Sequence, residues 1–500
     1  MEKFDVCVIG GGPAGYAAAM RALDFGKRTV LIEKNKLGGA GIHQGALWSK
    51  TWWEISREAR MINLHSRAFN LSQDGFEYDK VRNEVMEAVN ERMNLLTSHM
   101  ENLNSGLGEE LFEFIKGTAR VIGKNEVQII QDDQTISVEA DYIILATGST
   151  PRKLPHLPID EQNVFTSDGL NNLDSFPKSI VIVGAGVIGC EFATIFSNFG
   201  KTKVHLIDKG ERILPFEDED VVKVIEKNLE EKDVLIHRNS KLISMKVDNG
   251  EVEYVLQFDD GRKESFRVEK ALVSVGREPQ YDDLLADDIG VEFDERGIID
   301  DLTRTSVPNI YAVGDITADI SLVNVGELEG RYAVERIFGK PEQPLIYKNI
   351  STIMFLDPEI AGVGMNEIQA TQAGLDYKVV SLDYGCITRA TAMRITEGFI
   401  KVLVTNDDEL KILGMRVVGE HASSAIQTVA LLISQDRSII ELAELIHPHP
   451  SIIEGIQECG RILMGKPLLK PSVLRDIITC RIFEGGVYRE FEVRSFRTVI

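Results

Sequence analysis

A strand, a glycine-rich loop, a helix and a second strand ending in an acid occur twice in this chain, and this repeated unit constrains the fold most. In the first copy, the apolar run 4–9 leads into Gly10-Gly11-Gly12-Pro13-Ala14-Gly15, and the second strand ends at Glu33, about 20 residues further on. The glycines allow a tight turn and let a pyrophosphate approach the helix N-terminus, while the carboxylate binds ribose hydroxyls. We therefore expect a dinucleotide-binding fold at this end of the chain.

The second copy starts with the strand 179–183, continues through Gly184-Ala185-Gly186-Val187-Ile188-Gly189 and reaches Asp208 at the end of another strand. One chain with two such units binds two dinucleotides, which suggests FAD and a nicotinamide cofactor held for hydride transfer. The acid at position 208 favours NAD(H), because it would repel the 2′-phosphate of NADP. Arg212 lies close by in sequence and keeps NADP(H) open, although we interpret it as a solvated loop charge.

Three further segments (142–151, 271–279 and 309–317) each carry a strand into a glycine turn, and the third presents Asp315. With these pieces in order, the chain resembles the pyridine nucleotide–disulfide oxidoreductases, and among them the dihydrolipoamide dehydrogenases. The resemblance covers about residues 4–466 and includes a dimerisation region, with the segments IMFLDPEIAGVGMNE, EGFIKVLV and HPHPSIIEGI. It implies an α/β fold with two Rossmann-like dinucleotide-binding domains and an α+β C-terminal dimerisation domain.

The resemblance also implies domain boundaries. We expect a discontinuous FAD-binding domain at 1–151 and 278–345, an NAD-binding domain at 152–277 and a dimerisation domain at 346–466. Beyond it, the C-terminal extension 467–500 reads as strand, turn and strand, which predicts a β-hairpin. This hairpin could cover a sheet edge, close the substrate mouth or dock a partner protein.

The same resemblance implies which residues contact the cofactors, and it implies no metal ligands. The expected cofactor-binding residues are Gly10, Gly12, Pro13, Ala14, Gly15, Glu33, Lys34, Gly39, Ala40, Lys50, Ala119, Ala146, Thr147, Gly148, Gly314, Asp315, Gly184, Gly186, Val187, Ile188, Gly189, Asp208 and Gly276.

The loop LGGAGIHQGALWSK (37–50) departs from the family pattern. Relatives pass electrons from NADH to the flavin, then to a cysteine pair spaced C-x-x-x-x-C, and then to the substrate. Gly41 and Ala46 stand at those two positions, and neither side chain can carry electrons. The five cysteines of the chain are scattered without C-x-x-C spacing. Disulfide reduction by the family mechanism is therefore not expected.

Four other residues match the family's catalytic positions. Lys50 corresponds to the lysine near the flavin, and Glu191 to its carboxylate partner on the nicotinamide side; such a pair can steady charge on a reduced flavin. His449 and Glu454 correspond to a His–Glu dyad in which the acid orients the imidazole and raises its basicity. Without thiols, the dyad could donate a proton to another acceptor or persist as interface packing.

All three tryptophans, Trp48, Trp52 and Trp53, lie beside the missing cysteines. An aromatic wall there could stack a flat acceptor such as a quinone, and core packing explains the cluster equally well. We interpret His43, in the same loop, as a hydrogen-bonded structural histidine.

The net charge of the chain and the placing of its cysteines indicate which partners it can bind and where in the cell it works. With 55 Lys and Arg against 78 Asp and Glu, the net charge is −23, which disfavours nucleic acids and anionic membranes as partners. We expect no membrane span, because the apolar runs are far shorter than about 20 residues. A strand at the start of the chain, with no signal peptide before it, and scattered cysteines predict a cytoplasmic protein.

These observations favour an enzyme, an NAD(P)H-dependent flavoprotein that acts as a homodimer. It would reduce FAD with NADH and pass electrons directly to a small-molecule acceptor, a quinone or a similar aromatic. One alternative is hydride exchange between NAD(H) and NADP(H), because SLVNVGELEGR (321–331) looks somewhat like the soluble transhydrogenases. The other is a non-catalytic FAD-binding protein that works as a sensor or as a subunit of an assembly.

Overall fold

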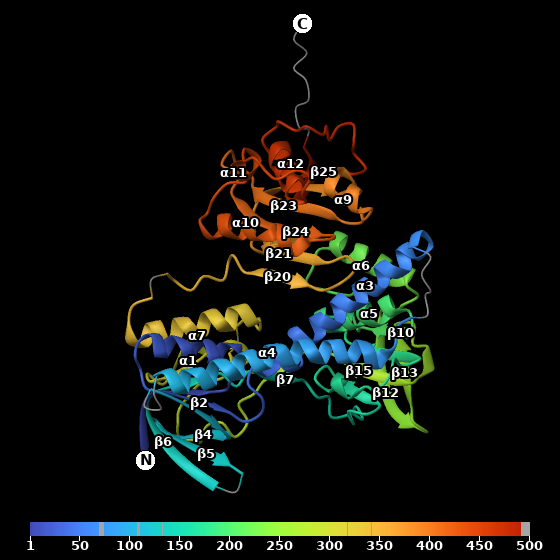
Figure 1. Ribbon diagram of the computed structural model, residues 1–500. Coiled ribbons are helices and arrows are strands. Elements are labelled where there is room, and N and C mark those ends of the chain that lie inside the picture. The colour runs from blue at the N-terminus through green and yellow to red at the C-terminus, as the bar shows by residue number, and fades with distance from the viewer. Residues whose placement is uncertain (70–74, 108–110, 133, 318, 342, 492–500) are drawn as a thin grey trace. The chain divides into compact units, whose positions relative to one another are not determined.

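The computed structural model describes residues 1–69, 75–107, 111–132, 134–317, 319–341 and 343–491 (Figure 1). Contacts divide the chain into two compact units, each described by itself below. The first contains residues 1–184, 242–257 and 262–345, and the second contains residues 185–241, 258–261 and 346–500.

The first unit is built on a sheet whose central strands are parallel. β1 (Glu2–Ile9) pairs with β2 (Thr29–Glu33) on one side and β6 (Gln134–Leu145) on the other. β3 (Phe112–Lys116) extends it beyond β2, and β19 (Ile310–Ala312) beyond β6. The central strands are apolar and buried on both faces, as parallel strands covered by helices must be.

Helices cover this sheet, and small residues allow them to approach closely. α1 (Pro13–Asp24) lies against α7 (Val323–Phe338), as Figure 1 shows. A Cβ atom at Gly330 would stand 2.2 Å from the carbonyl oxygen of Ala14, so only glycine fits at that crossing. α3 (Leu47–Phe69) and α4 (Tyr78–Leu107) pack against each other in the same unit.

The remaining strands of the first unit form smaller groups. β15 (Lys270–Val273) lies between β8 (Val164–Thr166) and β9 (Ser179–Val183) and pairs with both in parallel. β13 (Glu251–Phe258) and β14 (Lys263–Val268) are antiparallel. β4 (Thr118–Gly123) and β5 (Glu126–Gln131) are also antiparallel, and they belong to the main sheet because β5 pairs with β6.

The second unit combines a parallel pair with a large antiparallel sheet. β10 (Lys203–Ile207) and β11 (Leu235–His237) are parallel, and the unit also holds helices α5 (Val187–Phe199) and α6 (Glu219–Glu231). The antiparallel sheet has seven strands in the order β20-β21-β24-β23-β22-β25-β26. Their bounds are Ser351–Met354, Ile360–Gly364, Ile412–Val418, Phe399–Thr405, Tyr377–Asp383, Ile478–Glu484 and Val487–Glu490. α10 (Ala422–Ser434) and α12 (Ile453–Leu463) pack on this sheet (Figure 1).

The last two strands of this sheet come from the C-terminal extension. β25 pairs with β22 over six residues, from Leu382 opposite Ile478 to Tyr377 opposite Phe483. β26 folds back on β25 through the turn at Gly485 and Gly486, both with positive φ. Of the three roles considered for the extension, covering a sheet edge is the one that this pairing performs.

Candidate cofactor-binding and redox site

The first glycine loop lies at the carboxyl end of β1, where open parallel sheets bind ligands. Gly10 has a φ of +110°, and a Cβ atom there would stand 2.3 Å from the carbonyl oxygen of Ala146 at the end of β6. Gly12 is the N-cap of α1, and a Cβ atom there would meet nothing within 4 Å. Pro13, Ala14 and Gly15 form the first turn of α1. The free helix N-terminus next to open space fits a pyrophosphate.

Glu33 holds this loop from the end of β2. One carboxylate oxygen accepts the backbone N–H of Gly11 at 2.7 Å, and the other accepts that of Asn35 at 2.6 Å. Lys34 follows it and is exposed. The predicted acid is therefore fixed beside the loop, in the position from which a carboxylate reaches ribose hydroxyls.

The second glycine loop repeats these features. Gly184 has a φ of +102°, and a Cβ atom there would stand 2.5 Å from the carbonyl oxygen of Ser274. Gly186 is the N-cap of α5 and faces open space, and Val187, Ile188 and Gly189 form the first helical turn. Both loops therefore have the room and the donors that a dinucleotide requires.

Asp208 follows β10 and holds the second loop as Glu33 holds the first. Its carboxylate accepts the N–H of Ala185 at 2.9 Å and that of Gly210 at 2.8 Å. The side chain of Arg212 donates to the carbonyl of Pro215 at 3.0 Å. An acid fixed in this way, with the nearby arginine engaged elsewhere, favours NAD(H) over NADP(H).

Two further strand ends lie at the same edge of the sheet as the first glycine loop. Ala146, Thr147 and Gly148 follow β6, and Gly148 has a φ of +71° and open space around it. Gly314 and Asp315 follow β19, and a Cβ atom at Gly314 would stand 3.1 Å from the Cβ atom of Ala14. The structure thus gathers the ends of β1, β2, β6 and β19 at one edge of the sheet.

Three residues that support this edge escaped the sequence reasoning. The hydroxyl of Ser149 donates to Asp315 at 2.7 Å and accepts from Arg277 at 2.9 Å. The buried carboxylate of Glu329 accepts the N–H of Gly314 at 2.7 Å. A signal was present for two of them, because Ser149 and Arg277 lie just beyond strand ends in the segments already singled out.

The other predicted cofactor residues are spread over the first unit. Gly39 and Ala40 begin the short helix α2 (Gly39–His43), and a Cβ atom at Gly39 would stand 3.2 Å from the Cα of Gly12. Gly276, with a φ of +108° and open space around it, follows β15. Ala119 lies in β4 opposite Ile129 and belongs to the hydrophobic core. Its expected cofactor contact remains a prediction.

Gly41 and Ala46, where the resemblance places the family cysteines, lie in α2 and just before α3. A Cβ atom at Gly41 would stand 2.6 Å from Cγ of Pro13 and 3.7 Å from a methyl group of Val323. The N–H of Ala46 lies 3.4 Å from the carbonyl of Ala40. The ring of His43 bonds to the carbonyl of Leu37 at 3.0 Å, as expected of a structural histidine. The backbone at Gly41 thus lies directly against the start of α1.

A cysteine introduced at position 41 should therefore destabilise the fold. We expect Gly41→Cys to lower the free energy of unfolding by about 1–3 kcal/mol, because the rigid Pro13 ring must move to admit a Cβ atom. Ala46→Cys adds a sulfur to a Cβ atom that already exists and should cost less. Thermal unfolding of both variants would check this, and an equal loss of stability would contradict it.

The three tryptophans are core residues. Trp48, Trp52 and Trp53 are only 4–5% exposed. The rings of Trp48 and Trp52 lie 6.1 Å apart, and Trp52 continues into an aromatic cluster with Tyr78 at 5.4 Å and Phe176 at 6.3 Å. The interpretation of these rings as a wall against which an acceptor stacks is therefore wrong. They stabilise the start of α3 against α4 instead.

The His–Glu dyad is formed. Nδ1 of His449 lies 2.8 Å from Glu454, whose other carboxylate oxygen accepts the N–H of Ser451 at 2.8 Å. Burial opposes ionisation of Glu454, but the hydrogen bonds from His449 and Ser451 outweigh it and lower the pKa of that carboxyl. The side chain of His449 is 66% exposed, so its imidazole is accessible to a molecule from solvent.

Lys50 and Glu191 belong to different units. Lys50 lies in the first turn of α3. Glu191 is buried in α5, and its carboxylate accepts the N–H of Phe355 at 3.0 Å. The charge pairing expected between them remains a prediction.

All five cysteines are free thiols, and none lies in the loop 37–50. Cys7, Cys190, Cys459 and Cys480 are buried, and Cys386 is half-buried. Burial raises the pKa of each thiol, to about 12 for Cys480. Because the thiolate is the reactive form, these cysteines are poor redox groups.

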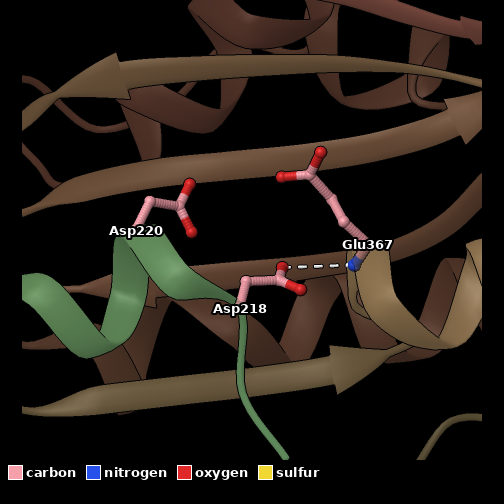
Figure 2. Close-up of side chains that lie close together, drawn as sticks. All are labelled: Asp218, Asp220 and Glu367. Carbon is pink, nitrogen blue, oxygen red and sulfur yellow. Dashed lines mark hydrogen bonds between the residues drawn. The ribbon is translucent and has the colours of Figure 1, made fainter. Parts of the chain in front are cut away.

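Among the described residues, one group could hold a metal ion by geometry, the carboxylates of Asp218, Asp220 and Glu367 (Figure 2). The fully buried ammonium of Lys401 lies 2.7, 2.6 and 3.0 Å from them, respectively. Arg481 of β25 adds a second cation 2.9 Å from Glu367. Desolvation opposes the charge on Lys401, but the carboxylates raise its pKa. This cluster is therefore an ion network in which Lys401 and Arg481, rather than a metal ion, neutralise the carboxylates.

None of the helices in the described part of the chain has the length and apolar character needed to cross a membrane.

Comparison with known proteins agrees with this fold. Residues 4–330 match the family described as pyridine nucleotide-disulphide oxidoreductase, and residues 350–459 match its dimerisation domain. Dihydrolipoyl dehydrogenases of Chlamydia muridarum and Bacillus subtilis are each 32% identical to this chain. The alignments cover 94% of this chain and 99% of the first relative, and 93% and 97% for the second.

Two solved structures share the fold. The Cu(II) complex of the HOCl-induced flavoprotein disulfide reductase RclA from Escherichia coli and LpdA from Mycobacterium tuberculosis each superpose with a TM-score of 0.81. Each is 25% identical and covers 93% of this chain and 100% of the other. The predicted fold class is thus confirmed.

Dihydrolipoyl dehydrogenase-like members of the matched family use FAD and NAD(H), which confirms the predicted cofactors. The match to the dimerisation domain indicates a homodimer. The coarser prediction, an NAD-dependent flavoprotein oxidoreductase, is confirmed as well. The chain belongs to the pyridine nucleotide-disulphide oxidoreductase family.

Proposed function

We propose that this protein takes hydride from NADH and passes the electrons from FAD directly to a non-disulfide acceptor, a quinone or a similar small aromatic molecule. The proposal departs from the names of the relatives, which describe dihydrolipoyl and disulfide chemistry. The proposal is supported by Gly41 and Ala46, which stand where the resemblance places the family cysteines. The tight contact at Gly41, where a Cβ atom would stand 2.6 Å from Cγ of Pro13, supports it as well.

The side chains retained around the site have defined tasks in this proposal. FAD, when bound, supplies the two-electron chemistry that links NADH to the acceptor. Lys50 and Glu191 steady charge on the side where NADH binds. The imidazole of His449, held at Nδ1 by Glu454, donates a proton to the acceptor as it is reduced. The tryptophans have no part in this reaction, since their rings are packed in the core.

Anaerobic titration with NADH tests the missing thiol relay. Family members with the cysteine pair develop a long-wavelength thiolate–flavin charge-transfer band on partial reduction. We expect NADH to bleach the flavin of this protein without that band. Its appearance would contradict the proposal, because it would require one of the five cysteines to reach the flavin.

Turnover experiments separate the proposal from its two alternatives. Steady-state oxidation of NADH over a panel of quinones, dyes and oxygen should identify acceptors. Hydride transfer from NADPH to an NAD analogue would favour the transhydrogenase alternative, which the fixed carboxylate of Asp208 disfavours. A flavin that stays oxidised under excess anaerobic NADH and NADPH would favour a non-catalytic sensor or assembly subunit.

A further inference from the structure

The C-terminal extension leaves the dimerisation domain through a segment that is anchored along its backbone. The N–H of Leu469 donates to the buried carboxylate of Glu458 at 2.8 Å. Pro467 and Pro471 are buried, and the N–H of Val473 closes a turn onto Lys470. The direction of the side chains in this segment is therefore fixed by the fold.

Two large apolar side chains of this anchored segment point into solvent. Leu468 is 71% exposed and Val473 is 78% exposed. Exposed apolar side chains of this kind indicate an interaction surface when they form a contiguous patch with other apolar residues.

Two more exposed apolar residues lie in the loop before His449. Leu445 is 53% exposed and Ile446 is completely exposed, and both belong to the matched dimerisation domain. Their loop is also held in place, because the amide of Gln457 donates to the carbonyl of Leu445 at 2.7 Å. An ion pair of 3.7 Å between Lys466 and Glu444 joins this loop to the start of the extension.

We infer that Leu445, Ile446, Leu468 and Val473 form one apolar surface, here called the tail face, and that a second copy of this chain covers it. The tail face is continuous with the region that the family uses for dimerisation, and it begins four residues before His449. A two-fold interface pairs a surface with itself, and apolar residues at its core are well suited to that. The extension thereby enlarges the homodimer interface beyond residue 459, where the family match ends.

Lysine substitutions in the full-length protein loaded with FAD test the inference by sedimentation velocity over a range of concentrations. Leu468→Lys and Val473→Lys should each weaken dimerisation about tenfold or more, because each places a charge in an apolar contact. Ile446→Lys is the benchmark inside the matched dimerisation domain. Val487→Lys is the matched control, since Val487 is a valine of the same extension and is 54% exposed on β26. It should leave the dimer within about twofold of the wild type.

The chain carries an excess of negative charge, so an added lysine lowers general repulsion between two copies, and weaker dimers cannot result from it. Circular dichroism and thermal unfolding verify that each variant is folded. Dimerisation unchanged in Leu468→Lys and Val473→Lys but weakened in Ile446→Lys would overturn the inference for the extension. A wild type that sediments as a monomer throughout would overturn it together with the homodimer. Neither result bears on NADH–quinone turnover, so the proposed function is tested separately.

Discussion

Replacing His449 with glutamine should lower turnover with a quinone acceptor by about 10²–10⁴-fold, the range by which positioned acids and bases accelerate reactions. The imidazole is exposed and is held at Nδ1 by Glu454, so it is the group available to deliver a proton. Reduction of the flavin by NADH should proceed at nearly the wild-type rate, because hydride transfer does not use this proton. Stopped-flow reduction and steady-state turnover would measure the two steps separately.

His447→Gln is the matched control for this substitution. The ring of His447 bonds to the carbonyl of Leu442 at 2.9 Å within its own loop, which is a structural role. The control should therefore retain turnover with the quinone. Equal losses in both variants would indicate that the loop needs its histidines for folding, and it would contradict a proton donor at position 449.

Glu454 acts through His449 and is a positioning residue. Its carboxylate holds Nδ1 of His449 at 2.8 Å, and a glutamine can keep a hydrogen bond to that ring. Glu454→Gln should therefore reduce steady-state turnover less than His449→Gln does, while flavin reduction by NADH stays near the wild-type rate. A loss as large as that of His449→Gln would contradict a positioning role.

Replacing Lys401 with methionine should lower the free energy of unfolding by about 3–5 kcal/mol, which is typical when one partner of a buried ion network is removed. The variant would leave Asp218 and Glu367 buried, with Arg481 as the nearest remaining cation. Thermal unfolding would detect the loss. Lys411→Met is the matched control: Lys411 pairs with Glu409 at the surface, so the midpoint should stay unchanged.

The stability that Lys401→Met loses should depend on pH in a direction that follows from the pKa of Asp218. Burial opposes the charge of Asp218, but Lys401 and backbone amides outweigh it and lower the pKa of that carboxyl. The stabilisation from Asp218 is therefore present above its ordinary pKa and is lost as the pH falls through the lowered value. Stability at acidic pH should thus fall more steeply in the wild type than in Lys401→Met. Parallel curves would contradict the role of the ion network.

The geometry of the two glycine loops could be predicted because all its determinants are local. Gly10 and Gly184 are glycines since the backbone there has positive φ and touches a neighbouring strand end. The acids Glu33 and Asp208 follow at a spacing set by one helix and one strand. The replacement of the family cysteines by Gly41 and Ala46 stays a prediction, which rests on the resemblance of the loop 37–50.

Contacts between distant parts of the chain could not be predicted. Arg481 and Glu367 lie more than a hundred residues apart, and no local pattern links them. The burial of the tryptophans depends on Tyr78 and Phe176, which come from other segments. Lys401 did leave a signal, since a lysine inside the apolar strand FIKVLV requires buried partners, but the sequence does not identify them.

Glu33 and Asp208 each bind two backbone N–H groups, one in the glycine loop and one just beyond the acid itself. Both loops are thus braced through contacts within the chain itself. A loop that is already ordered loses less conformational entropy when a ligand binds, so more of the interaction energy appears as affinity. A ligand of either loop would therefore meet a preorganised site, and the rigidity that glycine alone would not give comes from the acid that follows each loop.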